Sequence, residues 1–141
     1  MGRDGGMIAN MILPFWFGLG GKLGSGSQWF PWVHVRDVAG IIAHAIENDS
    51  VSGVLNAVAP EAASNSEFTA AFAKALGRPA CIPVPEFPVR TLFGPERAAL
   101  MFKGQKVVPK LTLASGYKFM YPDLASACKE FSHIMHPKSM S

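Results

Sequence analysis

The spacing of apolar positions along the chain changes several times between helical and extended patterns. Residues 7–18 are mostly apolar and predict a helix that Pro14 would kink or split. Residues 37–46 place their apolar side chains at helical spacing and predict a second helix. Short apolar runs at 32–35 and 54–58 predict strands. Strands that alternate with helices in this way indicate an α/β protein with a partly parallel sheet.

The second half of the chain has a more helical pattern. A helix is predicted through Leu76, with Ser64 or Asn65 as its N-cap and Gly77 as its left-handed C-cap. Residues 79–88 contain four prolines and predict a stiff, extended connector. The remaining predicted elements are short: helices at 89–93 and 95–102, an edge strand at 106–108, and a last helix from residue 122 or 123 to about 131.

These changes in pattern divide the chain into four parts. They are an α/β part at 1–60, a capped helix and connector at 61–82, a small and mostly helical domain at 83–131, and a frayed tail at 132–141. Two clear strands are too few for a parallel sheet, so we expect further strands on the N-terminal side. An incomplete sheet would expose an edge, which either is covered by a protein partner or drives aggregation.

Composition and charge exclude several classes of protein. The chain has 49% hydrophobic and 16% charged residues, a net charge of +3 and no block of basic residues, so nucleic-acid binding is not predicted. The apolar segment 7–19 is too short to cross a bilayer and contains Pro14. Gly6 occupies the position where N-myristoylation requires Ser or Thr. We therefore predict no export signal, no lipid anchor and no membrane span. Within the cell, the choice between a cytoplasmic and a mitochondrial location stays open.

Cysteine and histidine spacing gives no metal site. Cys81 and Cys128 are far apart and have no zinc-ligand spacing, so they are predicted to be reduced thiols. Cys128 with His133 and His136 would lack further ligands. No metal ion is predicted.

The segment 24–37, GSGSQWFPWVHVRD, carries a recognisable pattern. Its glycines, its glutamine and the run V-H-V-x-D-V-A resemble the later half of extended and atypical short-chain dehydrogenase/reductases, the nucleotide-sugar epimerase-like group. Residues 83–131 resemble the small C-terminal domain of unknown function in the "epimerase family protein" branch. The matching residues of this part are Pro83, Pro85, Gly94, Ala98, Gly104, Gln105, Val108, Pro109, Gly116, Phe119, Tyr121, Pro122 and Leu124.

The resemblance implies the C-terminal part of a Rossmann-like fold and an NADP-dependent oxidoreductase or epimerase acting on a small molecule. The glycine-rich cofactor fingerprint of that family is absent from this sequence, and Tyr117 and Tyr121 have no lysine four residues later. Residues 1–6 resemble the end of a strand and the turn after it. NADP is therefore expected in the full-length family member, whereas no cofactor-binding or catalytic residue is predicted in this chain.

In the family the 24–37 segment lies on the substrate side of the fold. Gln28 offers both amide donors and an acceptor, and Trp29 or Trp32 could stack on a flat ring. His34 could titrate near neutrality. These four residues are the predicted substrate-binding set, whereas Asp37 is predicted to hold the strand-to-helix corner. The alternative is that both tryptophans belong to the core and that His34 is structural.

The function predicted from the sequence is that of a substrate-side segment, inactive by itself, of an atypical NADP-linked short-chain dehydrogenase/reductase. Two alternatives to this function remain open at this point. One is a non-enzymatic interaction module, whose apolar surface pairs with a partner chain, and the other is a non-functional truncated isoform.

Overall fold

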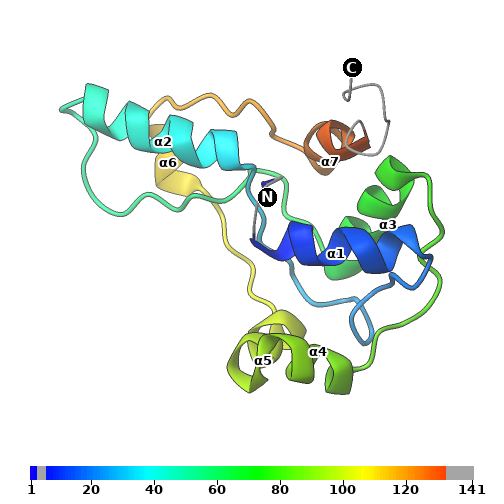
Figure 1. The fold of residues 1–141 in the computed structure, drawn as a ribbon. Helices are drawn as coiled ribbons and strands as arrows, with labels where there is room; N and C mark the ends of the chain where they lie inside the picture. Colours follow the sequence, from blue (N-terminus) through cyan, green and yellow to red (C-terminus); the bar gives the residue numbers. More distant parts are fainter. Residues whose placement is uncertain (3–5, 133–141) are drawn as a thin grey trace.

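A computed structural model describes residues 1–2 and 6–132, and the regular secondary structure in these residues is helical (Figure 1). The helices are α1 Gly6–Trp16, α2 Val35–Glu47, α3 Asn65–Leu76, α4 Glu86–Phe93, α5 Pro95–Lys103, α6 Lys110–Ala114 and α7 Leu124–Ser132. Figure 1 shows three groups: α1, α3 and α7 lie together, α4 pairs with α5, and α2 lies beside α6. The predicted tail at 132–141 falls almost wholly outside the described residues.

Helix α3 confirms its predicted boundaries and caps. The Ser64 hydroxyl accepts a hydrogen bond from the Glu67 backbone N–H, and the Glu67 carboxylate accepts one from the Ser64 N–H at 2.7 Å. This reciprocal pair is a capping box, which satisfies two otherwise unpaired donors. Gly77 ends the helix in the left-handed conformation, with φ of 63°.

Other helix boundaries differ from the prediction. Helix α1 continues through Pro14 to Trp16, because a proline so close to the C-terminal end interrupts little of the helix. Helix α2 begins at Val35, two residues before the predicted start. Its N-cap is His34, whose Nδ1 accepts a hydrogen bond from the Arg36 backbone N–H at 3.2 Å.

The three predicted strands are not formed in the described residues, which contain isolated bridges between Leu23 and Val84 and between Trp29 and Ser64. Residues 32–35, 54–58 and 106–108 were expected as strands, and that prediction was wrong. A strand requires a continuous ladder with a neighbour, and each segment here finds at most a few backbone partners. The described residues therefore present no sheet edge for a partner to cover.

The segment around Val33 nevertheless keeps a strand-like environment. The Met1 amino group donates to the Val33 carbonyl, and the Val35 N–H donates to the Met1 carbonyl at 2.7 Å, which is the pattern of a parallel pair. On the other side, the Ala59 N–H donates to the Trp32 carbonyl at 2.7 Å. These single backbone hydrogen bonds hold the segment in place but do not form a ladder.

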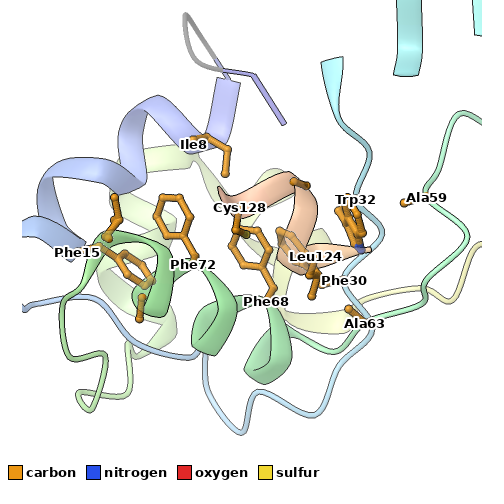
Figure 2. Packing of buried hydrophobic residues seen from close by; sticks show 13 residues of the cluster. Ile8, Phe15, Phe30, Trp32, Ala59, Ala63, Phe68, Phe72, Leu124 and Cys128 are labelled. Carbon is orange, nitrogen blue, oxygen red and sulfur yellow. The ribbon is translucent and has the colours of Figure 1, made fainter. Parts of the chain in front are cut away.

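The main core is aromatic and joins α1, α3 and α7 (Figure 2). Phe68 and Phe72 on α3 are fully buried. Phe72 meets Phe15 of α1 edge-on at 5.0 Å between ring centroids. Cys128 of α7 packs into the same cluster and is 1% exposed. Burial of this apolar surface stabilises the three-helix group, although α1 and α7 are short helices.

A second, smaller cluster holds the α4–α5 pair. Leu23, Val89 and Ala98 are its buried members. Residues 22–24 connect to this pair through Val84, which precedes α4. The Val84 N–H donates to the Lys22 carbonyl at 2.9 Å, and the Val84 carbonyl accepts from the Gly24 N–H at 3.1 Å. Long-range backbone pairing therefore anchors α4 and α5 to the N-terminal part of the chain. No helix of the described residues has the length and apolar character needed to cross a membrane.

The two thiols are expected to differ strongly in reactivity. Burial raises the pKa of the Cys128 thiol to about 12, with a further contribution from Glu61, whereas Cys81 is exposed. Because the thiolate is the reactive form, we expect iodoacetamide at pH 8 to modify Cys81 alone in the folded chain. Mass spectrometry after proteolysis measures both sites. Equal modification rates without denaturant would contradict the packing of α7, and modification of both in urea is the control.

Candidate functional site

A groove of about 540 Å³ lies between α1, the loop that follows it and the α4–α5 pair. Apolar side chains dominate its wall, and the polar side chains in it are Asn10, Asn65 and Arg97. The apolar lining residues are Met7, Met11, Leu13, Pro14, Phe15, Leu19, Leu23, Phe30, Val84, Pro88, Val89, Leu92, Phe93 and Met101. Its volume lies within the range of small-molecule sites, which is roughly 300–1,000 Å³.

Two buried glycines allow the loop after α1 to approach its neighbours closely. A Cβ on Gly21 would lie 1.6 Å from the Ile82 carbonyl oxygen, and one on Gly20 would lie 2.4 Å from the Phe15 ring. A side chain at Gly21 would push the loop away from Ile82 in the connector, and one at Gly20 would displace the Phe15 ring of α1. The groove therefore depends on glycine at both positions.

Asn65 links the groove to α3. Its side chain is 2% exposed, and its Oδ1 accepts a hydrogen bond from the Leu23 backbone N–H at 2.7 Å. Its amide NH₂ group is a hydrogen-bond donor, and Asn65 is one of the polar residues at the groove wall.

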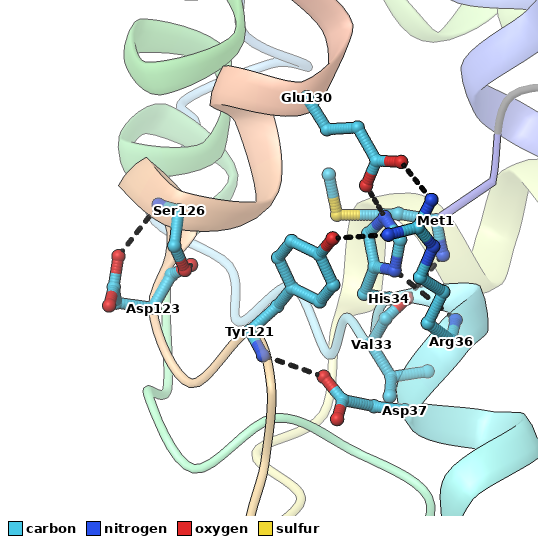
Figure 3. A network of polar contacts seen from close by, with 9 residues as sticks. All are labelled: Met1, Val33, His34, Arg36, Asp37, Tyr121, Asp123, Ser126 and Glu130. Atoms are coloured by element: carbon cyan, nitrogen blue, oxygen red, sulfur yellow. Dashed lines mark hydrogen bonds and ion pairs between the residues drawn. The ribbon is translucent and has the colours of Figure 1, made fainter.

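The predicted corner residue Asp37 joins α2 to the segment before α7 (Figure 3). Its carboxylate is fully buried and accepts hydrogen bonds from the Tyr117 hydroxyl at 2.9 Å and from the Met120 and Tyr121 backbone N–H groups at 2.8 and 2.9 Å. The partners lie about 80 residues away in sequence, whereas the prediction had placed them on the corner itself. Burial and the contact with Asp37 raise the pKa of Tyr117 to about 12.

His34 lies in the same network and is 2% exposed. Its Nε2 is 2.6 Å from the Glu130 Oε2 on α7, and its ring stacks on Tyr121 with 3.9 Å between centroids. Figure 3 shows Glu130 reaching from α7 towards both His34 and Arg36. Desolvation lowers the pKa of His34, and the nearby Glu130 carboxylate opposes this effect. With both ring nitrogens engaged, His34 ties α2 to α7.

Gln28 and Trp29 make their contacts with other residues than those of this network. The Gln28 amide donates to the Leu23 carbonyl at 3.0 Å and to the Met101 carbonyl at 3.4 Å. Trp29 is 41% exposed, and the Lys106 ammonium lies 4.7 Å from the centre of its ring. Gln28 thus stabilises the loop against α5, whereas Trp29 offers an accessible ring.

Trp32 belongs to the core, as one alternative of the sequence analysis had it: it is 3% exposed, and its indole N–H donates to the Glu61 carbonyl at 3.1 Å. It also lines a smaller cavity of about 210 Å³ beside Met1. None of the four predicted substrate-binding residues lines the large groove, so their role stays a prediction. Sequence reasoning missed the groove. The sequence feature that could have revealed it is the large number of apolar residues at 7–19, because one buried helix face needs fewer.

Comparison with known proteins defines the class. Residues 84–131 match the family described as "Domain of unknown function (DUF1731)". Most of the chain matches proteins named epimerase family protein, so it corresponds to the C-terminal part of an epimerase-family short-chain dehydrogenase/reductase, as predicted. Among these relatives are the "Epimerase family protein SDR39U1" of Bos taurus, 55% identical over 92% of this chain, and that of Homo sapiens, 52% identical over 92%. The Bacillus subtilis protein YfhF is 40% identical over 89%.

A solved structure agrees with this similarity. The crystal structure of human epimerase family protein SDR39U1 (isoform 2) with NADPH has a TM-score of 0.87 and 52% identity, over 94% of this chain and 45% of that chain. The chain spans 45% of the Bos taurus relative and 44% of the human one, a little less than half their length. The fold described above is therefore that of the corresponding part of a Rossmann-like protein.

Proposed function

We propose that this chain supplies the substrate-binding part of an NADPH-dependent oxidoreductase or epimerase of the short-chain dehydrogenase/reductase class. The observation that carries the proposal is the apolar groove between α1 and the α4–α5 pair, in a chain 52% identical to a protein crystallised with NADPH. The groove receives a small-molecule substrate. The cofactor is held by a dinucleotide-binding part with a glycine-rich phosphate turn, which the 141 residues lack.

The tyrosines of this chain support the need for such a second part. Tyr117 donates its hydroxyl proton to Asp37, and its pKa is raised to about 12. A general acid for reduction near neutral pH needs a pKa close to the working pH, so Tyr117 is a poor proton donor. Tyr121 is occupied by His34 and Arg36. The proton donor of the complete enzyme therefore comes from outside this chain.

A second candidate function, protein docking, is favoured by the outer face of α2. Val35, Ala39, Ile42 and Ile46 follow one another at helical spacing, and all four are exposed, Ile46 to 75%. The opposite face of the helix is packed, with Asp37 and Ile41 buried. We name these four residues the α2 stripe. Its occupant, in this proposal, is the dinucleotide-binding part of an epimerase-family protein, because the relatives are about twice as long as this chain.

Co-expression tests both proposals. The chain is produced with the part of human SDR39U1 that it does not match. We expect a one-to-one complex on size exclusion that binds NADPH, measured by calorimetry. Ile42→Glu places a charge in the α2 stripe and should weaken the complex at least tenfold, or about 1.4 kcal/mol. Ala70→Glu, at an exposed position of α3, is the matched control and should have no effect.

The outcomes separate the two proposals. One-to-one NADPH binding by the 141-residue chain alone would contradict the need for a second part. A complex that forms equally well with Ile42→Glu would contradict docking through the α2 stripe. The complex could also form without binding NADPH and without lowering the absorbance of NADPH at 340 nm when a carbonyl substrate is added. In that case the enzymatic proposal fails and the docking proposal stands.

A further inference from the structure

The groove between α1 and the α4–α5 pair points to a particular class of ligand. We propose that it binds an elongated apolar molecule that carries one anionic group, such as a carboxylate or sulfonate, and one oxygen acceptor along its apolar body. This inference rests on the proposed function in treating the groove as the substrate site. Its physical basis is independent, because it comes from the side chains of the groove itself.

The wall of the groove matches an apolar ligand body. Of the side chains that line it, three are polar, and three methionines, Met7, Met11 and Met101, supply flexible and polarisable contacts. A nucleotide sugar has two phosphates and several hydroxyl groups, each of which needs a polar partner when it leaves water. Three polar side chains are too few for such a ligand, whereas they suffice for an apolar molecule with two polar points.

The rim of the groove extends this apolar character outward. Leu13 and Leu19 beside α1, and Leu92 on α4, line the groove and are 62%, 60% and 78% exposed. Burying these exposed leucine side chains against an apolar molecule that continues beyond the cavity would be favourable, because it removes apolar surface from water. The ligand is therefore elongated and is partly held at the rim.

The position of the anionic group follows from Arg97. Its guanidinium is the cationic side chain of the groove and makes no ion pair within the described residues. Arginine stays charged at any physiological pH and binds planar oxyanions with two parallel hydrogen bonds. An anion at the α5 end of the groove would complete this pairing.

The second polar point is Asn65 on α3. Its Oδ1 accepts from the Leu23 N–H, so the NH₂ group is the donor that a ligand in the groove would use. Because this side chain is buried, a hydrogen bond from it to a ligand oxygen would be shielded from water. Arg97 and Asn65 together set the orientation of the ligand.

Two dyes with one ring system provide a direct test. 1-Anilinonaphthalene-8-sulfonate and N-phenyl-1-naphthylamine share the aromatic skeleton and differ by the sulfonate, and both fluoresce when bound in an apolar site. We expect the sulfonate to bind the 141-residue chain at one-to-one stoichiometry and about three- to tenfold more tightly than the neutral dye, because of the pairing with Arg97. Near-UV circular dichroism ensures that the chain is folded in each titration.

Matched variants locate the two interactions. Arg97→Met should remove the preference for the sulfonate and leave the neutral dye unchanged, whereas Arg90→Met on α4, outside the groove, should change neither. Leu92→Glu should weaken both dyes about tenfold, since it places a charge on the apolar rim. Phe87→Glu is its control, because Phe87 is 79% exposed on the same helix and does not line the groove.

Three results would overturn the inference: equal affinities for the two dyes, sulfonate binding that is insensitive to Arg97→Met, or displacement of the dye by UDP-glucose at concentrations where decanoate has no effect. The expected competition is the reverse, with decanoate displacing the dye. None of these measurements uses NADPH, so failure here leaves the co-expression test unaffected. Failure of NADPH binding in that test likewise leaves the dye results standing.

Discussion

Phe72→Ala is expected to lower the free energy of unfolding by about 3–5 kcal/mol, which is the usual cost of removing a buried phenylalanine ring. Phe72 is fully buried and contacts two other rings, Phe15 at 5.0 Å and Phe68 at 5.7 Å between centroids. Its removal leaves a cavity where α1 meets α3. Because natural domains are stable by only about 5–15 kcal/mol, this loss removes a large share of the stability.

Urea denaturation followed by tryptophan fluorescence measures this loss, and Trp16 and Trp32 lie in or beside the affected group. Phe87→Ala removes the same ring from a position that is 79% exposed and should change the unfolding free energy by less than about 0.5 kcal/mol. A loss below about 1 kcal/mol for Phe72→Ala would show that α1 does not pack on α3 as described.

Asp37→Asn is expected to cost about 2–4 kcal/mol. The buried carboxylate accepts from the Tyr117 hydroxyl and the Met120 N–H through Oδ1, and from the Tyr121 N–H through Oδ2. The amide of asparagine turns one of these acceptors into a donor, which then faces another donor in a buried position. Urea denaturation again measures the loss, and α2 should separate from the segment before α7.

The titration of Tyr117 gives this substitution a second readout. In the folded chain burial, and after it the contact with Asp37, raises its pKa to about 12. The protonated hydroxyl therefore stabilises the fold below pH 10, and this stabilisation is lost as the pH rises towards 12. In Asp37→Asn the pKa, followed by absorbance at 295 nm, should fall towards 10. Asp49→Asn, at an exposed acidic position, is the control. An unchanged Tyr117 titration in Asp37→Asn would contradict the contact.

The ends of α3 and the start of α5 were predicted well, since their signals are local. Ser64 and Gly77 bound α3 as expected, and Pro95 begins α5. The predicted strands failed for the opposite reason. A strand is stabilised by backbone partners from elsewhere in the chain, and a short apolar run such as 54–58 has the same composition whether or not those partners are present.

The sequence by itself determined the family resemblance and the capped ends of α3, because motifs and caps depend on neighbours within a few residues. Tertiary structure alone decided that the partners of Asp37 come from 117–121, that Trp32 and His34 are buried, and that the apolar residues around α1 face α4 and α5 across a groove. These features arise from contacts between segments about 30 to 90 residues apart, and no local pattern specifies which surfaces meet.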